Sequence, residues 1–141
     1  MDFSSISIAF LIHATEAADE LLKKVTEVFA IADEEISVEK MEGYYGNDIL
    51  SVKIHVIGPR TSLVSNRIFS RLSKNSREVL RAELDRSMDE HDSLYIRVDR
   101  QTLGSGDIFL SDEEPIHMKL KPKWRTGGHE FMKRQYAELI K

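Results

Sequence analysis

The sequence predicts an α+β fold, with helices packed on one face of a mainly antiparallel sheet, in the order β-α-β-β-α-α-β-β-α. Polar and apolar residues alternate in several short segments, most strictly over 94–101, and this period of two is typical of a half-buried strand. Between these segments apolar residues recur at helical spacing. Because the helices are expected on one face, the other face of the sheet is expected to be solvated.

The first half of the chain begins with a strand over residues 5–12, where apolar residues alternate. A helix follows through about residue 30, with Thr15 as its expected N-cap. Ile36 and Val38 indicate a short second strand. After a turn-rich loop with two tyrosines, residues 49–57 form the expected third strand.

The second half is expected to start with a helix at residues 63–72, because Gly58 and Pro59 end the third strand. A break near residues 74–76 leads to another helix with Ser76 as its N-cap. The strand that starts at Leu94 comes next, and residues 107–110 form a short strand or a loop. The last elements are a strand at residues 116–120, closed by Pro122, and a helix at residues 129–140.

Size and composition favour one domain over residues 1–141, in which 122–141 form a basic C-terminal extension. The chain has no cysteine, which excludes disulfides, thiol catalysis and thiolate metal sites. The apolar run from Ile6 to Ile12 is too short to cross a membrane, and no basic segment of a signal peptide precedes it. We therefore expect a cytoplasmic protein that does not associate with membranes.

The net charge of −4 is unevenly distributed. From Pro115 onward there are seven basic and two acidic residues, and residues 60–86 hold seven basic and three acidic ones. Such local basic patches favour a polyanionic partner more than the total charge suggests. The alternative is that these charged residues simply lie on solvent-exposed helix faces and bind no partner.

The polar positions of three predicted strands give the strongest functional signal, because all of them would face the same solvated surface. An arginine fork grips phosphate, and a tyrosine ring stacks on a base. The residues on this surface would be Lys53, His55, Tyr95, Arg97, His117, Lys119 and Lys121, with Arg100 and Gln101 following at the end of one strand. The alternative is a solvated strand face with no ligand.

Further candidate residues lie outside this predicted surface. Arg67, Arg71 and Lys74 have the spacing of one helix side, which Arg77 and Arg81 repeat on the next helix. A second group is the alternating series Lys119, Lys121, Lys123 and Arg125, expected on one side of an extended strand. The alternative for these lysines is that they protect an edge strand from pairing with other chains. Tyr44, between two glycines, is a candidate for stacking on a nucleotide, although a tight hairpin is the alternative.

Catalysis, metal binding and cofactor binding find little support. The five histidines lack the spacing of a metal site, and Asp89, Asp92 and Asp99 have no evident further ligands. No phosphate-binding loop, dinucleotide glycine pattern or nucleophile elbow occurs in the sequence. We therefore expect no enzyme activity, no metal and no cofactor.

Three segments in the same order, at 13–16, 43–47 and 94–101, resemble a family of small archaeal proteins described as RNA-binding and as predicted exosome subunits. The resemblance spans about residues 5–121 and implies an α+β fold like that of ribosomal protein L-five. It also implies an RNA-related role, with protein subunits of an RNA-processing complex as further partners.

Together, these observations predict a non-catalytic RNA-binding protein, accessory to RNA processing or degradation. The expected RNA-binding residues are Tyr44, Lys53, Arg67, Arg71, Lys74, Tyr95, Arg97, Arg100, Gln101, Lys119, Lys121 and Lys123. The alternative is a protein-interaction adaptor that never contacts RNA and uses exposed aromatic residues, for which Trp124, Phe131 and Tyr136 are the candidates.

Overall fold

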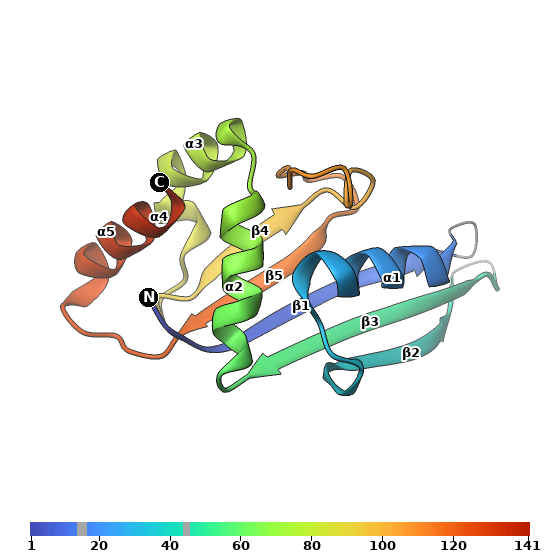
Figure 1. Ribbon diagram of the computed structural model, residues 1–141. Helices are drawn as coiled ribbons and strands as arrows, with labels where there is room; N and C mark the ends of the chain where they lie inside the picture. Colours follow the sequence, from blue (N-terminus) through green and yellow to red (C-terminus); the bar gives the residue numbers. More distant parts are fainter. Residues whose placement is uncertain (14–16, 44–45) are drawn as a thin grey trace.

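A five-stranded antiparallel sheet forms the centre of the fold (Figure 1). The computed structural model describes residues 1–13, 17–43 and 46–141. The strand order is β2-β3-β1-β5-β4, so β1 lies in the middle and β2 and β4 lie at the edges. The strands are β1 (Phe3–His13), β2 (Ile36–Glu42), β3 (Asp48–Ile57), β4 (Leu94–Val98) and β5 (Ile116–Pro122).

The helices pack on one side of this sheet. In Figure 1 the first long helix runs along the strands and the second crosses them, whereas the last three helices pack together near β4. The predicted order of strands and long helices is confirmed, and two short helical segments add to it. The helical segments are α1 (Ala18–Phe29), the 3₁₀ turn η1 (Asp33–Glu35), α2 (Arg60–Arg71), α3 (Lys74–Ala82), α4 (Leu84–Ser87) and α5 (Gly128–Ile140).

The hydrophobic core lies between the sheet and the helices. The even-numbered residues of β1 from Ile6 to Ile12 are all buried, whereas the odd-numbered ones are partly or fully exposed. β4 and β5 alternate in the same way, as a sheet with one covered face requires. β4, β5 and β1 from Ser5 onward therefore present their polar residues to the uncovered face.

The boundary between α2 and α3 differs from the sequence-based expectation. The break lies at Leu72 and Ser73, and the N-cap is Ser73, because its Oγ accepts a hydrogen bond from the backbone N–H of Ser76 at 3.1 Å. Lys74 therefore begins a new helix, and the expected helical row that joins it to Arg67 and Arg71 is wrong. The Thr15 cap lies outside the described residues.

The segment 107–110 forms single β-bridges in place of a strand. Ile108 pairs with Leu72 and Leu110 pairs with Val98. These bridges tie the chain between β4 and β5 to the end of α2, and they add a partner at the outer edge of β4.

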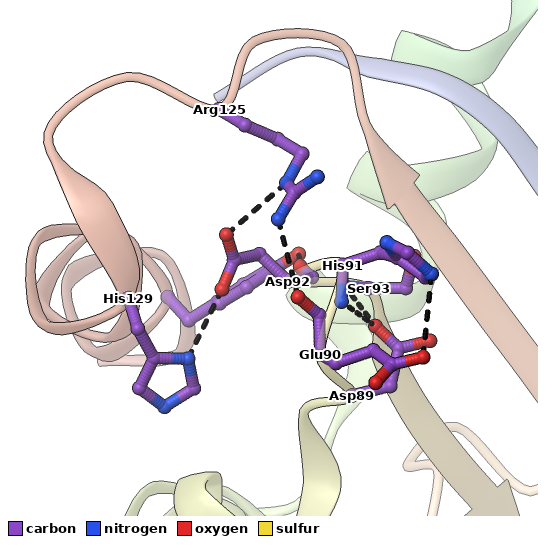
Figure 2. Close-up of polar contacts among 8 residues, drawn as sticks. Asp89, Glu90, His91, Asp92, Ser93, Arg125 and His129 are labelled. Carbon is purple, nitrogen blue, oxygen red and sulfur yellow. Dashed lines mark hydrogen bonds and ion pairs between the residues drawn. The ribbon is translucent and has the colours of Figure 1, made fainter.

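The C-terminal segment is held by Asp92, whose carboxylate is almost buried (Figure 2). Arg125 Nε donates to Asp92 Oδ2 at 3.2 Å, and His129 Nδ1 lies 3.0 Å from Asp92 Oδ1. The hydroxyl of Tyr136 donates to the carbonyl oxygen of Asp92 at 2.6 Å. The expectation that Tyr136 is exposed is therefore wrong, because its ring is fully buried beside Phe3.

Because α5 packs against α3 and α4, it leaves the opposite face of the sheet uncovered. Across the described residues, no helix has the length and apolar character needed to cross a membrane.

Candidate nucleic-acid interface

The uncovered side of the sheet, which we call the open face, carries the polar positions of β3, β1, β5 and β4. Strand pairing aligns them in rows across the sheet. One row runs Lys53, Ala9, His117, Arg97, and the next runs His55, Ser7, Lys119, Tyr95. Lys121 continues the series opposite Ser5. The prediction that side chains from three strands share one solvated surface is confirmed, and β1 adds a fourth strand to it.

On the open face, the middle strand β1 carries smaller side chains from Ser5 to Ala9 than the strands on either side of it. Ser5, Ser7 and Ala9 are small. The positions paired with Ser7 and Ala9 are lysine or histidine on both neighbouring strands, whereas Ser5 pairs with Lys121 on one side and with the exposed Ile57 on the other. Adjacent strands are about 5 Å apart, so the two cationic flanks stand about 10 Å from each other. This arrangement suits an extended polyanion that lies between them.

Tyr95 is held in a fixed orientation on the open face. Its hydroxyl donates to Asp89 Oδ2 at 2.9 Å, and Lys119 Nζ lies 5.6 Å from its ring centroid. The ring remains 44% exposed, so part of it is available for stacking. Burial alone would raise the pKa of Asp89, but hydrogen bonds from the Ser93 backbone and the Tyr95 hydroxyl outweigh it, and the pKa is lowered.

The remaining polar groups of the open face make weak, exposed contacts. Arg97 Nη2 lies 3.2 Å from Asp112 Oδ1, and both side chains are more than half exposed. His55 Nδ1 lies 3.4 Å from the hydroxyl of Ser7. Exposed ion pairs are worth little in water, so a phosphate can replace Asp112 at small cost.

The alternating basic series after residue 118 is only partly in line. Lys119 and Lys121 point to the open face, but β5 ends at Pro122 and Lys123 lies over the ring of Trp124. The expectation for Arg125 is wrong, because its guanidinium turns to Asp92 and to the carbonyl oxygen of Glu90. The edge-protection alternative is also wrong, since β5 lies between β1 and β4.

The basic residues of α2 and α3 lie on the helix side of the sheet and so are not brought together with the open face. Arg67 Nη1 donates to the carbonyl oxygen of Glu27 at 3.4 Å, and Lys74 is exposed. Arg77 donates to the carbonyl oxygens of Ser70, Leu72 and Lys141. Its role is therefore to hold helix ends and the C-terminus.

Arg100 is buried, and its guanidinium donates to the carbonyl oxygens of Leu11 and Glu114. This residue therefore braces the chain, whereas its neighbour Gln101 is exposed in the turn after β4. Arg71 is half-buried, and its carbonyl accepts the backbone N–H of Ile108. Tyr44 lies outside the described residues.

Sequence reasoning did not single out the small residues of β1 or the loop residue Glu114 that lies beside them. The alternation in residues 5–12 carried a signal for the small residues, because its odd-numbered positions are serine, serine and alanine before Leu11. Within the described ranges, no three His, Asp or Glu side chains gather in a way that could hold a metal ion.

An open sheet face with aromatic and cationic side chains, backed by helices, is the arrangement of α+β domains that bind RNA through a sheet. The chain belongs to the family whose model is described as RNA binding, and this model matches residues 5–122. It is 32% identical over 126 residues to the RNA-binding protein PAB1135 of Pyrococcus abyssi, covering 84% of this chain and 81% of that protein.

Solved structures share the fold at lower sequence identity. Protein SSO0741 from Sulfolobus solfataricus superposes with a TM-score of 0.80 at 18% identity, over 96% of each chain. Protein AF2318 from Archaeglobus fulgidus gives a TM-score of 0.78 at 22% identity and covers 98% of this chain and 99% of its own. This coverage includes α5, so the C-terminal helix is part of the shared fold although the family model ends at residue 122.

Proposed function

We propose that this protein binds RNA through the open face and acts without catalysis as an accessory factor in cytoplasmic RNA processing or degradation. The observation that carries the proposal is the pair of aligned rows across four strands, which gathers Lys53, Arg97, Lys119 and Tyr95 on one uncovered surface. Membership of the RNA binding family supports the same ligand.

In this proposal the two cationic flanks hold phosphates while Tyr95 stacks on a base. Lys119 and Lys121 occupy alternate positions of β5, about 6–7 Å apart by the rise of a strand. This spacing is near that of successive phosphates in an extended strand of RNA. The affinity is then mainly electrostatic and falls as salt rises.

The test compares the open face with the helix side by two double variants of equal charge change. Lys119→Gln with Lys121→Gln removes two open-face cations, and Arg67→Gln with Lys74→Gln removes two from the helix side. Fluorescence anisotropy with labelled single-stranded and duplex RNA, at several salt concentrations, gives the affinity and its salt dependence.

We expect the open-face pair to weaken binding roughly tenfold. The slope of log affinity against log salt should become shallower, its magnitude falling by roughly 1.4–1.8, the value for two phosphate contacts. The helix-side pair should leave both quantities nearly unchanged. The proposal fails if the wild-type protein binds neither RNA at low salt, or if the helix-side pair has the larger effect.

The adaptor function is the second candidate, because Trp124 is 63% exposed and Phe131 is 36% exposed. Aromatic residues of this kind are enriched at interface hot spots. A pull-down with and without nuclease separates the candidates. Partners that survive RNA removal and are lost with Trp124→Ala would favour the adaptor.

A further inference from the structure

A hollow on the open face lies where β1 extends beyond β5. Pairing of β1 with β5 ends at Ala9 and His117, whereas pairing of β1 with β3 continues to His13 and Ile49. The gap beside the unpaired half of β1 forms a cavity of about 370 Å³. This volume falls near the lower end of the range for small-ligand sites, about 300–1,000 Å³.

We propose that this cavity receives one unpaired nucleobase of the bound RNA, with guanine preferred. The inference rests on the proposed function, because the row of Lys53, Ala9, His117 and Arg97 adjoins the cavity and would bring the RNA backbone to it. It adds to that function a defined base site and a requirement for unpaired RNA.

The cavity lining suits the flat face of a base. Its apolar part comes from Ala9, Leu11 and Pro115, and Leu11 is 43% exposed to the hollow side of the strand. Two imidazole rings, His13 and His117, also line the cavity. Unpaired bases in RNA complexes are commonly stacked on such rings and then hydrogen-bonded along their Watson–Crick edge.

Glu114 supplies a fixed acceptor at this cavity. Its φ of 42° lies in the left-handed region, which a non-glycine residue adopts only where its surroundings impose it. Arg100 Nε holds the carbonyl oxygen of Glu114 at 2.8 Å, and Glu114 Oε1 lies 3.2 Å from His13 Nε2. The backbone of Glu114 is therefore held at the cavity, and its carboxylate, with the side chain 68% exposed, is accessible to a ligand.

The carboxylate favours guanine because a carboxylate only accepts hydrogen bonds and has two oxygens. Guanine presents two adjacent donors, N1–H and the 2-amino group, on its Watson–Crick edge. Adenine and cytosine offer an amino group beside an acceptor nitrogen, and uracil offers one N–H between two carbonyl oxygens. Only guanine thus matches both carboxylate oxygens without placing an acceptor against them.

Recognition of this kind requires the base to leave any duplex. In an A-form helix the Watson–Crick edge is occupied by the pairing partner, and the base is stacked on both sides. The site therefore distinguishes an unpaired guanine from the same guanine in a duplex.

The experiment uses two labelled heptamers, one of uridine only and one with a single central guanosine, and measures their affinities by anisotropy. The variant is Glu114→Gln, which leaves the backbone contact with Arg100 in place. The matched control is Glu113→Gln, which has the same charge change one residue away and outside the cavity lining. Circular dichroism and thermal melting verify that all three proteins are folded.

We expect the wild-type protein to bind the guanosine heptamer roughly five- to hundredfold more tightly than the uridine heptamer, the range for a bidentate contact. Glu114→Gln should lose this preference and keep its affinity for the uridine heptamer, and Glu113→Gln should retain the preference. Equal binding of both heptamers by the wild type, or a preference that survives in Glu114→Gln, would overturn the base site alone. Failure to bind either heptamer would overturn the base site, and if duplex RNA also failed to bind at low salt, the proposed function would be overturned with it.

Discussion

Arg100 Nη1 donates a hydrogen bond to the carbonyl oxygen of Leu11 at 2.6 Å, across 89 positions of the sequence. Leu11 lies beyond Ala9, the last residue of β1 that pairs with β5. The guanidinium thus replaces the missing strand as a donor to this edge, and it also lies 5.8 Å from the ring centroid of Phe10. With its second bond to the Glu114 carbonyl, it fixes both walls of the cavity.

We expect Arg100→Ala to destabilise the protein by about 2–4 kcal/mol, because it leaves two carbonyl oxygens without these donors and removes a buried side chain. Arg100→Lys should also be destabilising, since an ammonium does not reproduce the fork that reaches both oxygens. Urea denaturation measures the free energy of unfolding. Arg97→Ala is the control, with an expected change within about 0.5 kcal/mol because its ion pair is exposed. A similar small change for Arg100→Ala would contradict the bracing role.

Arg97 and Arg100 show how far the sequence predicts the direction in which a side chain points. Alternation within β4 placed Arg97 correctly on the open face, because parity determines the face of a strand. β4 ends at Val98, but Arg100 has the even parity of the buried positions of β4, and its side chain is buried as theirs are. Alternation therefore indicates an inward side chain, contrary to the expected RNA contact of Arg100. The long-range carbonyls of Leu11 and Glu114 that hold it leave no local pattern in the sequence.

The same distinction applies to the helices and the C-terminus. Helical spacing predicted α2, α3 and α5, but the capping hydrogen bond of Ser73 decided where α3 begins. The sequence predicts an exposed Tyr136, but its ring packs against Phe3 and its hydroxyl donates to the carbonyl oxygen of Asp92, so the side chain is buried. Local periodicity thus predicts elements and faces, whereas tertiary partners determine which polar side chains are available.

Replacement of Tyr95 tests the stacking role separately from charge. Tyr95→Leu should weaken binding of single-stranded RNA roughly five- to tenfold, because stacking on an aromatic ring contributes about 1–3 kcal/mol per base. Tyr95→Phe keeps the ring, so its affinity should remain within about twofold of wild type. Anisotropy at fixed salt measures both variants. An equal loss in the two would show that the bond of the hydroxyl with Asp89, and not the ring, matters.

Glu35 should make stability depend on acidic pH. Its Oε1 and Oε2 accept hydrogen bonds from Arg60 at 2.9 Å, and these hold the pKa of Glu35 below its ordinary value of 4.5 despite partial burial. A lowered pKa in the folded state means that the stabilisation is fully present above about pH 4.5 and is lost as pH falls through the folded pKa.

The measurement is urea denaturation of the wild type and Glu35→Gln between pH 7 and pH 3. The wild type should be more stable at neutral pH, and the difference should shrink below about pH 4.5. Glu34→Gln, an exposed neighbour, serves as control and should run nearly parallel to the wild type. A gap between wild type and Glu35→Gln that stays constant down to pH 3 would rule out this linkage.

The end of α1 offers a stabilising substitution. Ala30 adopts a left-handed conformation with φ 57° at the C-cap, a position where glycine avoids the steric cost of a Cβ. Ala30→Gly should therefore raise the free energy of unfolding by about 0.5–1 kcal/mol, even after the larger entropy of the unfolded glycine chain is included. Thermal melting gives the sign directly. A lower melting temperature would mean that the alanine methyl contributes more by packing than it costs in strain.

The last prediction concerns the contact of Asp92 with the C-terminal segment, shown in Figure 2. Asp92→Asn keeps the side-chain shape and tolerates the φ of 63°, but it removes the charge that faces Arg125 and His129. Because the carboxylate is only 8% exposed, we expect a loss of about 1–3 kcal/mol in stability. Hydrogen exchange should show the largest loss of protection in α5, since its start and its Tyr136 both depend on this turn.

Asp112→Asn, which removes an exposed partner of Arg97, is the matched control and should change stability by less than about 0.5 kcal/mol. If α5 stays protected in Asp92→Asn, apolar packing of Met132, Tyr136 and Ile140 alone holds the helix, and the charged contact is dispensable.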